Sequence, residues 1–462
     1  MESLRNIWVI PELRMRVLFT LGLLGVFRLG SQITTPGVNA VAIQELAEQY
    51  AQNTMFGLYD LFSGQNLSQM TIFALGVMPY ISASIIMQLL TVVSPYLERL
   101  SKEGELGRRK ITQYTRYGTI LLALVQSFTI ALFIENFGNA PGGMQVVYEP
   151  GIGFRLMTVV TLTAGTTFVM WLGEQITERG VGNGMSLLIF AGIVVGLPSA
   201  TLTTLDQMRT GQMGVIRVAL LVALMIVVVG VIVFFERAQR RVTVQYAKRV
   251  VGRRMYGGSS THIPLKVNTG GVIPVIFASS LLALPATFAQ AFPPESWAQR
   301  ASAQLQWGMP LYNLAYVTMI IFFTYFYVAI IFKPDDVAEN MRKYGGFIPG
   351  IRPGKRTAEY LDTILARITV VGACYLAVVA LLPEFLMAGF RVVQIPFIGE
   401  QLDAALPQFV TEGLNVTFFF GGTSLLIVVG VAMDTVNQVE SQLIMRHYDG
   451  FMKRTRIRGR RG

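Results

Sequence analysis

Long apolar stretches alternate with polar loops along the whole chain. A helix needs about 20 apolar residues to cross the roughly 30 Å hydrocarbon core of a bilayer. Ten stretches approach or reach that length, so the pattern predicts ten transmembrane helices and an all-α integral membrane protein. The expected spans cover residues 17–33, 71–93, 117–134, 154–172, 185–205, 215–235, 271–288, 311–332, 368–382 and 416–433.

Lysine and arginine are distributed unevenly between the loops. The loops at 98–116, 236–270 and 333–367 are rich in both residues, whereas 34–70 and 136–150 contain neither. Short loops that carry Lys and Arg stay in the cytoplasm. We therefore expect the basic loops and both termini to be cytoplasmic.

The expected spans divide evenly around an external link near Asp206. Five spans on each side give the two halves opposite orientations, as in proteins built from inverted repeats with a functional path between them. We expect an N-terminal half at 1–205, a C-terminal half at 206–435 and a basic cytoplasmic tail at 436–462. The symmetry rests on the count of spans, because no internal sequence repeat is evident.

Composition agrees with a membrane protein. Only 14% of the residues are charged, against roughly 25% in soluble chains. The net charge of +11 comes from 38 Lys and Arg against 27 Asp and Glu, and these charges collect in loops rather than forming a nucleic-acid surface. The single cysteine, Cys374, excludes an intramolecular disulfide and is expected to be a small buried apolar side chain.

The sequence carries no recognisable catalytic motif. It has two histidines, His262 and His447, and no HExxH helix, Cys/His cluster or Walker-type phosphate loop. The glycine-rich segment 180–184 follows no strand, so we interpret it as a tight turn between the fourth and fifth spans. We expect no enzymatic activity, no cofactor and no metal site.

The centres of the spans are almost free of charge. Arg28, Glu384 and Asp434 lie near span ends, whereas charges at bilayer depth mark ion and proton paths. This argues against a proton-coupled transporter. A secondary transporter of a small solute, built from inverted repeats, remains the alternative function and would need a charged or helix-broken site at the midplane.

Several spans carry polar but uncharged residues. These are Ser82, Ser84 and Gln88 near the second span, and Asn268, Thr269, Ser279 and Ser280 near the seventh. Hydrogen bonding between packed helices explains such residues. The sharper interpretation, a pair of helices that must part, is not favoured by periodicity alone.

Short motifs recur in order through nearly the whole chain. They include FALGVMPYI at 73–81, KEGE at 102–105, GRRK at 107–110, QYTR at 113–116, ERGVGNG at 178–184, QYA at 245–247, IPLKVN at 263–268, GVIP at 271–274, GFIPGIRPG at 346–354 and GGTSLLI at 421–427. In this order and at these spans and loops, they resemble the SecY family, the central subunits of the bacterial Sec protein-conducting channel (translocon).

The resemblance implies a central hourglass pore between the two inverted five-helix halves. It implies that unfolded polypeptides cross the plasma membrane through this pore and that transmembrane segments leave sideways into lipid. The family's apolar constriction falls on a ring of six residues: Val77, Ile81, Met185, Ile189, Ile276 and Ile427. A narrow apolar ring blocks ions by dewetting. Without the resemblance, these side chains would be interpreted as ordinary core.

The segment 57–70 is short and mixed in polarity, and on its own it indicates an interfacial turn of helix. The resemblance implies a plug that rests beneath the ring and moves away when the channel opens. This role falls on Tyr59, Asp60, Leu61, Phe62, Ser63, Gly64 and Leu67. The lateral gate falls on Ser82 and Gln88, facing Asn268, Ser280 and Leu284.

The basic loops 236–270 and 333–367 are far longer than a turn requires. Exposed Arg and Lys suit RNA phosphates or an acidic protein face. The resemblance implies that these loops dock the ribosome and the SecA motor through Arg352, Lys248, Arg253 and Arg254. No ATP-binding motif is present, so such a partner must supply the energy.

The resemblance also implies the remaining partners and the location. SecE-like and SecG-like small membrane subunits accompany the chain, and signal sequences, translocating polypeptides and membrane lipid contact it. The location is the bacterial plasma (inner) membrane, which the chain crosses many times.

Overall fold

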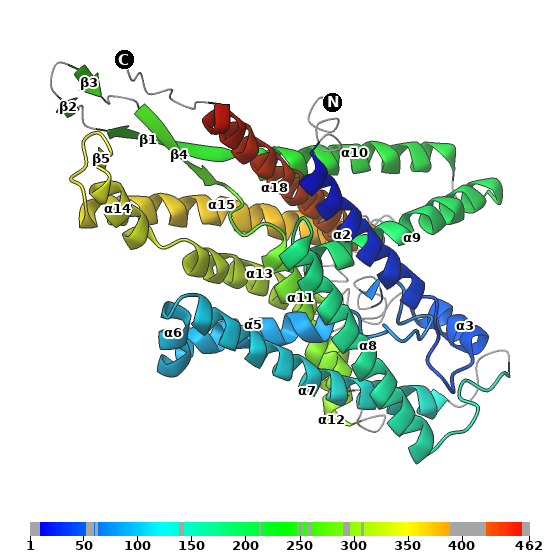
Figure 1. The fold of residues 1–462 in the computed structure, drawn as a ribbon. Coiled ribbons are helices and arrows are strands. Elements are labelled where there is room, and N and C mark those ends of the chain that lie inside the picture. The colour runs from blue at the N-terminus through cyan, green and yellow to red at the C-terminus, as the bar shows by residue number, and fades with distance from the viewer. Residues whose placement is uncertain are drawn as a thin grey trace. The chain divides into compact units, whose positions relative to one another are not determined.

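The computed structural model describes residues 10–51, 60, 63–137, 143–211, 214–246, 249–251, 254–256, 260–289, 296–305, 309–388 and 422–454. Helices dominate these residues, and a helix lies at each of the ten predicted spans (Figure 1). The chain divides into two compact units. The first comprises Met1–Thr203, Ala283–Gln306 and Val431–Gly462, and the second comprises Thr204–Leu282 and Trp307–Gly430.

The first unit is a bundle of helices. Its elements are α2 (Pro11–Gly30), α3 (Ala40–Ala51), α5 (Met78–Val93), α6 (Pro95–Lys102), α7 (Glu105–Phe137), α8 (Ile152–Arg179), most of α9 (Gly184–Arg209) and α12 (Trp297–Gln304). Helix α7 packs against both α5 and α8, and α2 packs against α8. Helices α5 and α6 meet at an angle of 99°. Ser94 between them is extended, because proline at the next position disfavours the helical conformation.

The glycine-rich segment 180–184 is a tight turn between α8 and α9, as predicted. The backbone N–H of Val181 donates to Thr20 Oγ1 over 3.1 Å, and that of Gly182 donates to Gln438 Oε1 over 3.1 Å. Val181 also packs with Leu13 in a small apolar cluster. The turn therefore contacts both α2 and the part of the last helix, α18 (Gly422–Arg454), that belongs to the first unit.

The second unit combines apolar helices with a small sheet. Its helices are α10 (Val215–Arg237), most of α11 (Ile273–Ala289), α13 (Pro310–Ile331), α14 (Pro334–Lys343), α15 (Lys355–Ala388) and the start of α18. Helix α15 packs against α13, α14 and α10. Six helices in the described part of the chain are long and apolar enough to cross a membrane, or seven if α5 and α6 form one bent span.

The two long basic loops contain strands that the sequence pattern did not predict. Strands β1 (Gln239–Tyr246), β4 (Ser260–Lys266) and β5 (Gly346–Phe347) form an antiparallel sheet in the order β4-β1-β5. A separate pair joins β2 (Arg249–Val251) to β3 (Arg254–Tyr256). Strand β5 comes from the loop 333–367, so the sheet joins both loops into one structure.

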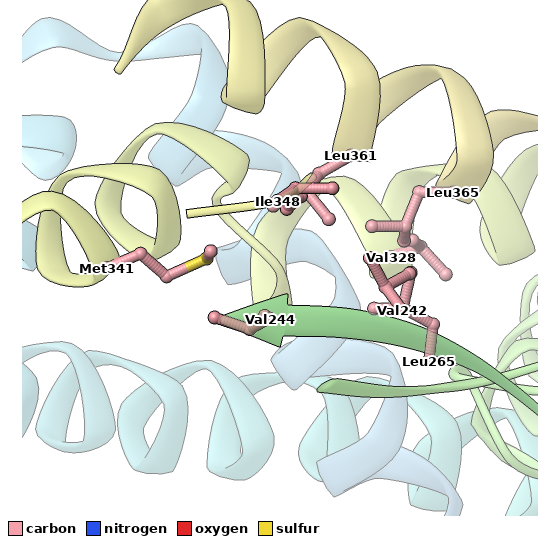
Figure 2. Close-up of a cluster of buried hydrophobic side chains, with 8 residues drawn as sticks. All are labelled: Val242, Val244, Leu265, Val328, Met341, Ile348, Leu361 and Leu365. Carbon is pink, nitrogen blue, oxygen red and sulfur yellow. The ribbon is translucent and has the colours of Figure 1, made fainter. Parts of the chain in front are cut away.

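A buried apolar cluster holds this sheet against the helices. Figure 2 shows its eight side chains, Val242, Val244, Leu265, Val328, Met341, Ile348, Leu361 and Leu365, gathered between the strands and the nearby helices. Successive side chains of a strand point to opposite faces, so residues two positions apart share a face. Val242 and Val244 therefore both reach the cluster. Full burial of a leucine contributes about 1.5–3 kcal/mol. We call the sheet, α14 and the start of α15 the platform.

Cys374 is exposed on α15, so the expectation that it is buried was wrong. Val370, Val371 and Val378 are also exposed, and their spacing places them on the same helix face as Cys374. Lipid tails are as apolar as a protein core. Hydrophobicity alone therefore does not distinguish a lipid-facing residue from a buried one in a membrane protein.

Candidate pore, plug and docking sites

Four of the predicted ring residues lie in the first unit, and all four are buried there. Val77 directly precedes α5, and its carbonyl accepts the backbone N–H of Ile81 over 3.1 Å. Met185 and Ile189 are both on α9. A spacing of four residues places each pair on one side of its helix. The first unit thus presents two aliphatic pairs, one from α5 and one from α9.

Close contact between α8 and α9 positions Met185. A Cβ on Gly173 of α8 would lie 2.5 Å from Met185 Sδ, and a Cβ on Gly184 would lie 1.9 Å from the carbonyl oxygen of Gly173. Backbone atoms leave no room for a side chain at Gly184, whereas a side chain at Gly173 would displace the end of Met185. The first turn of α9 is therefore held directly against the α8 backbone, and Met185 lies over that contact.

The described part of the predicted plug packs beside the ring residues of this unit. Gly64 lies against Gly192 of α9, one turn beyond the ring residue on that helix: a Cβ on Gly192 would be 2.8 Å from Gly64 Cα. Gly64 also has a positive φ of +77°, which glycine adopts at no steric cost. Ser63 lies against Gly76, whose Cβ would be 3.1 Å from Ser63 Cα. The segment therefore contacts α9 and the residue before Val77.

A buried carboxylate organises this segment. Asp60 Oδ1 accepts the backbone N–H groups of Leu67 and Ser68 over 2.9 Å each, and Asp60 Oδ2 accepts the Ser68 hydroxyl over 2.7 Å. The Ser63 hydroxyl also donates to Asp60. Burial raises the pKa of the Asp60 carboxyl, although the hydrogen bonds from Ser68, Leu67 and Ser63 oppose the shift. The predicted plug residues Tyr59, Leu61 and Phe62 lie outside the described residues.

The other two ring residues, Ile276 of α11 and Ile427 of α18, are buried in the second unit. A Cβ on Gly430 would lie 2.5 Å from Val272 Cγ1. Val272 and Gly430 are each about one helical turn from a ring residue. The start of α11 therefore packs against α18 close to both isoleucines.

The predicted gate residues belong to both units. On α5, Ser82 is buried and the Gln88 side chain donates to Ser84 Oγ over 3.3 Å. In the second unit, the Ser280 hydroxyl donates to the carbonyl of Ile276 over 2.7 Å. Leu284 is half-buried on the last part of α11, which belongs to the first unit. That α5 and α11 face each other remains a prediction.

Asn268 differs from the other predicted gate residues. It precedes α11 and donates from Nδ2 to Glu236 Oε1 over 2.6 Å. The sequence did not predict the bond between Asn268 and Glu236, because one carboxylate in the last turn of α10 is an unremarkable sequence feature. Gly192 was missed for a related reason: nothing in the sequence pairs it with Gly64.

The platform presents Arg352 on a well-anchored turn. Ile348 is buried in the apolar cluster, and the Thr357 hydroxyl donates to the Arg352 carbonyl over 3.0 Å. Positive φ angles at Gly350 (+82°) and Gly354 (+106°) shape the turn, while Arg352 itself is exposed. Arg254 begins β3, and Lys248 and Arg253 lie outside the described residues.

The long apolar helices in the described part of the chain are those of a multi-spanning membrane protein. A model of the SecY family matches residues 71–436. The protein translocase subunit SecY of Escherichia coli (strain K12) is 48% identical over 451 residues, which covers 97% of this chain and 96% of that protein. The SecY subunit of Aquifex aeolicus is 44% identical over 454 residues, covering 98% and 100%. The chain belongs to the SecY family.

Solved structures agree on the fold. A protein-conducting channel superposes with a TM-score of 0.61 at 16% identity, covering 93% of this chain and 92% of the other. Sec61 in the canine ribosome-channel complex from the endoplasmic reticulum superposes with a TM-score of 0.57, also at 16% identity and with the same coverage. The predicted resemblance, helical membrane fold and protein-conducting function are confirmed, and the channel is favoured over a small-solute transporter.

Proposed function

We propose that this chain conducts unfolded polypeptides through a pore between its N-terminal half (1–205) and C-terminal half (206–435). The constriction is formed by the six ring residues named above. Aliphatic side chains fit this task because they disfavour a continuous file of water and require no specific partner in the passing chain. The observation that carries this proposal is the seating of Ser63 and Gly64 against Gly76 and Gly192, next to two of the ring pairs.

The seated segment acts as the plug. The hydrogen bonds that Asp60 accepts tie its carboxylate to Leu67 and Ser68, so these residues move together. Among the described residues, the segment meets α9 through the close contact of Gly64 with Gly192 and through the end of the flexible Gln65 side chain near Gly196. The glycine contact holds the turn in one position and contains no hydrogen bond that must break when the two backbones separate.

The lateral gate lies between α5 and α11, and signal sequences and transmembrane segments leave through it into lipid. Gln88 and Ser280 each make a hydrogen bond within their own helix. These bonds survive when the helices part. This reduces the cost of opening, because a buried polar group left without a partner costs about 1–3 kcal/mol.

The platform docks cytoplasmic partners through its basic residues, above all Arg352. Exposed arginine suits RNA phosphates and acidic protein surfaces. The structural similarity to Sec61 in a ribosome-channel complex supports a ribosome as one partner, and the SecA motor is the other. SecE-like and SecG-like subunits complete the channel in a bacterial plasma membrane, with both termini in the cytoplasm.

Cross-linking tests the gate. Ser82→Cys and Leu284→Cys, in a Cys374→Ser background that removes the native exposed thiol, should form a bridge that stops translocation, and reduction should restore it. Each single-cysteine variant provides the control for oxidation alone. Undiminished translocation through a fully bridged channel would contradict the assignment of α5 and α11 as the gate.

A further inference from the structure

The segment that leads from β4 into α11 is tightly enclosed within the second unit. A Cβ on Gly372 of α15 would lie 2.6 Å from the carbonyl oxygen of Val267, and a Cβ on Gly430 of α18 would lie 2.5 Å from Val272 Cγ1. The segment therefore packs against the backbones of α15 and α18 at positions where glycine leaves space for it. The beginning of α11 is therefore closely packed between α15 and α18.

Hydrogen bonds attach the same segment to the end of α10. The backbone N–H of Val267 donates to the carbonyl of Ala238 over 2.9 Å. The Asn268 side chain donates to Glu236 Oε1 over 2.6 Å and to the carbonyl of Gly271 over 3.1 Å. One amide group thus connects the last turn of α10 to the backbone turn that begins α11.

Burial makes this contact strong. Glu236 is 8% exposed and Asn268 is 3% exposed. A buried carboxylate is costly unless it is hydrogen-bonded, and hydrogen bonds to a charged acceptor are roughly twice as strong as neutral ones. Glu236 therefore holds the Asn268 amide more firmly than a neutral acceptor would, and displacing Asn268 removes a donor from a largely buried carboxylate.

We propose that Glu236 and Asn268 form a latch that positions the cytoplasmic end of α11 and sets how readily the lateral gate opens. This inference rests on the proposed gate function of α11. Both are positioning residues, since they act on the gate helix rather than on the polypeptide. With the latch intact, α11 leaves its resting position only when a signal sequence binds favourably enough. Without it, the open arrangement is more populated and a weaker signal suffices.

Translocation by the reconstituted channel with its partner subunits and motor tests the latch. Two precursors are compared, one with an intact signal sequence and one whose apolar signal core is shortened. Asn268→Leu removes the donor at similar volume and should raise the ratio of shortened-signal to intact-signal translocation by about fivefold or more. Glu236→Gln retains the acceptor but not the charge, so it should raise the ratio less.

Asn313→Leu is the matched control. Asn313 is another buried asparagine of the second unit, on α13, and its replacement should leave the ratio unchanged. A purely structural role for the pair would reduce translocation of both precursors together, and that result would overturn the latch. If Asn268→Leu does not fold, an unchanged ratio in Glu236→Gln overturns it instead.

The bridge between the cysteines at Ser82 and Leu284 separates this inference from the gate proposal. If the bridge stops translocation and the latch variants leave the ratio unchanged, the gate stands and the latch is refuted. If the bridge does not stop translocation, the gate assignment fails, and the latch fails with it.

Discussion

Replacing Gly192 by alanine should unseat the plug segment. The new Cβ would lie 2.8 Å from Gly64 Cα and 3.2 Å from Gly64 N. Both atoms belong to the backbone, so no side chain can rotate away. Either α9 or the plug segment must move. The segment is much shorter than the helix, so we expect the segment to move.

The magnitude follows from comparing the seated and unseated states. Alanine in place of glycine stabilises a helix interior by about 1 kcal/mol, but α9 is helical in both states, so this gain cancels in the seating equilibrium. Forcing a methyl group into a packed contact costs about 1–3 kcal/mol, and only the seated state carries that cost. The unseated population should therefore rise about 5- to 150-fold.

Ion conductance of the resting channel in a planar bilayer measures this change. Gly192→Ala should increase the leak, whereas the matched variant Gly196→Ala should not. The Cβ at Gly196 would meet Gln65 Nε2 at 3.3 Å, and the end of a flexible side chain moves aside at little cost. Equal resting conductance in both variants and the native protein would refute the seating argument.

Three further perturbations test other parts of the structure. Burial raises the pKa of Asp60 above 3.8. The stability that protonation of Asp60 gives the plug turn is therefore complete below that pH and is lost as the pH rises through the folded-state pKa. Asp60→Asn should abolish this pH dependence in amide-exchange protection factors. Leu361→Ala, at a position with 0% exposure, should destabilise the platform by about 2–5 kcal/mol, measured by thermal unfolding and protease sensitivity. Arg352→Glu should reduce motor-driven translocation at least about tenfold at an unchanged melting temperature, and an equal loss in Arg356→Glu would show that the effect is not specific to this position.

The sequence predicted the positions of the membrane helices well, because apolar length is a local property. A helix occurs at every predicted span, and the turn at 180–184 lies where the glycines indicated. The strands were missed. Only Val242 and Val244 alternate clearly with polar residues in β1, and the partner strand β5 has two residues. So short a pattern does not indicate a strand until the chain is folded.

The site residues came from the family resemblance rather than from local pattern. An aliphatic residue such as Ile189 is indistinguishable in sequence from any other apolar position of its helix. Contacts between distant residues were not predictable either: Gly64 and Gly192 carry no mark of their pairing, and Glu236 carries none of its bond to Asn268. These depend on packing, which a single sequence does not specify.

The pairing of β5 with β1 has a mechanical consequence. Gln245 lies opposite Phe347 and Tyr246 opposite Gly346, so a force on the turn that carries Arg352 is transmitted through β1 to its other neighbour, β4. Strand β4 ends at Lys266, two positions before Asn268. A macromolecule that binds one basic loop therefore also exerts force on the other loop, and the sheet transmits that force to the N-terminal end of α11.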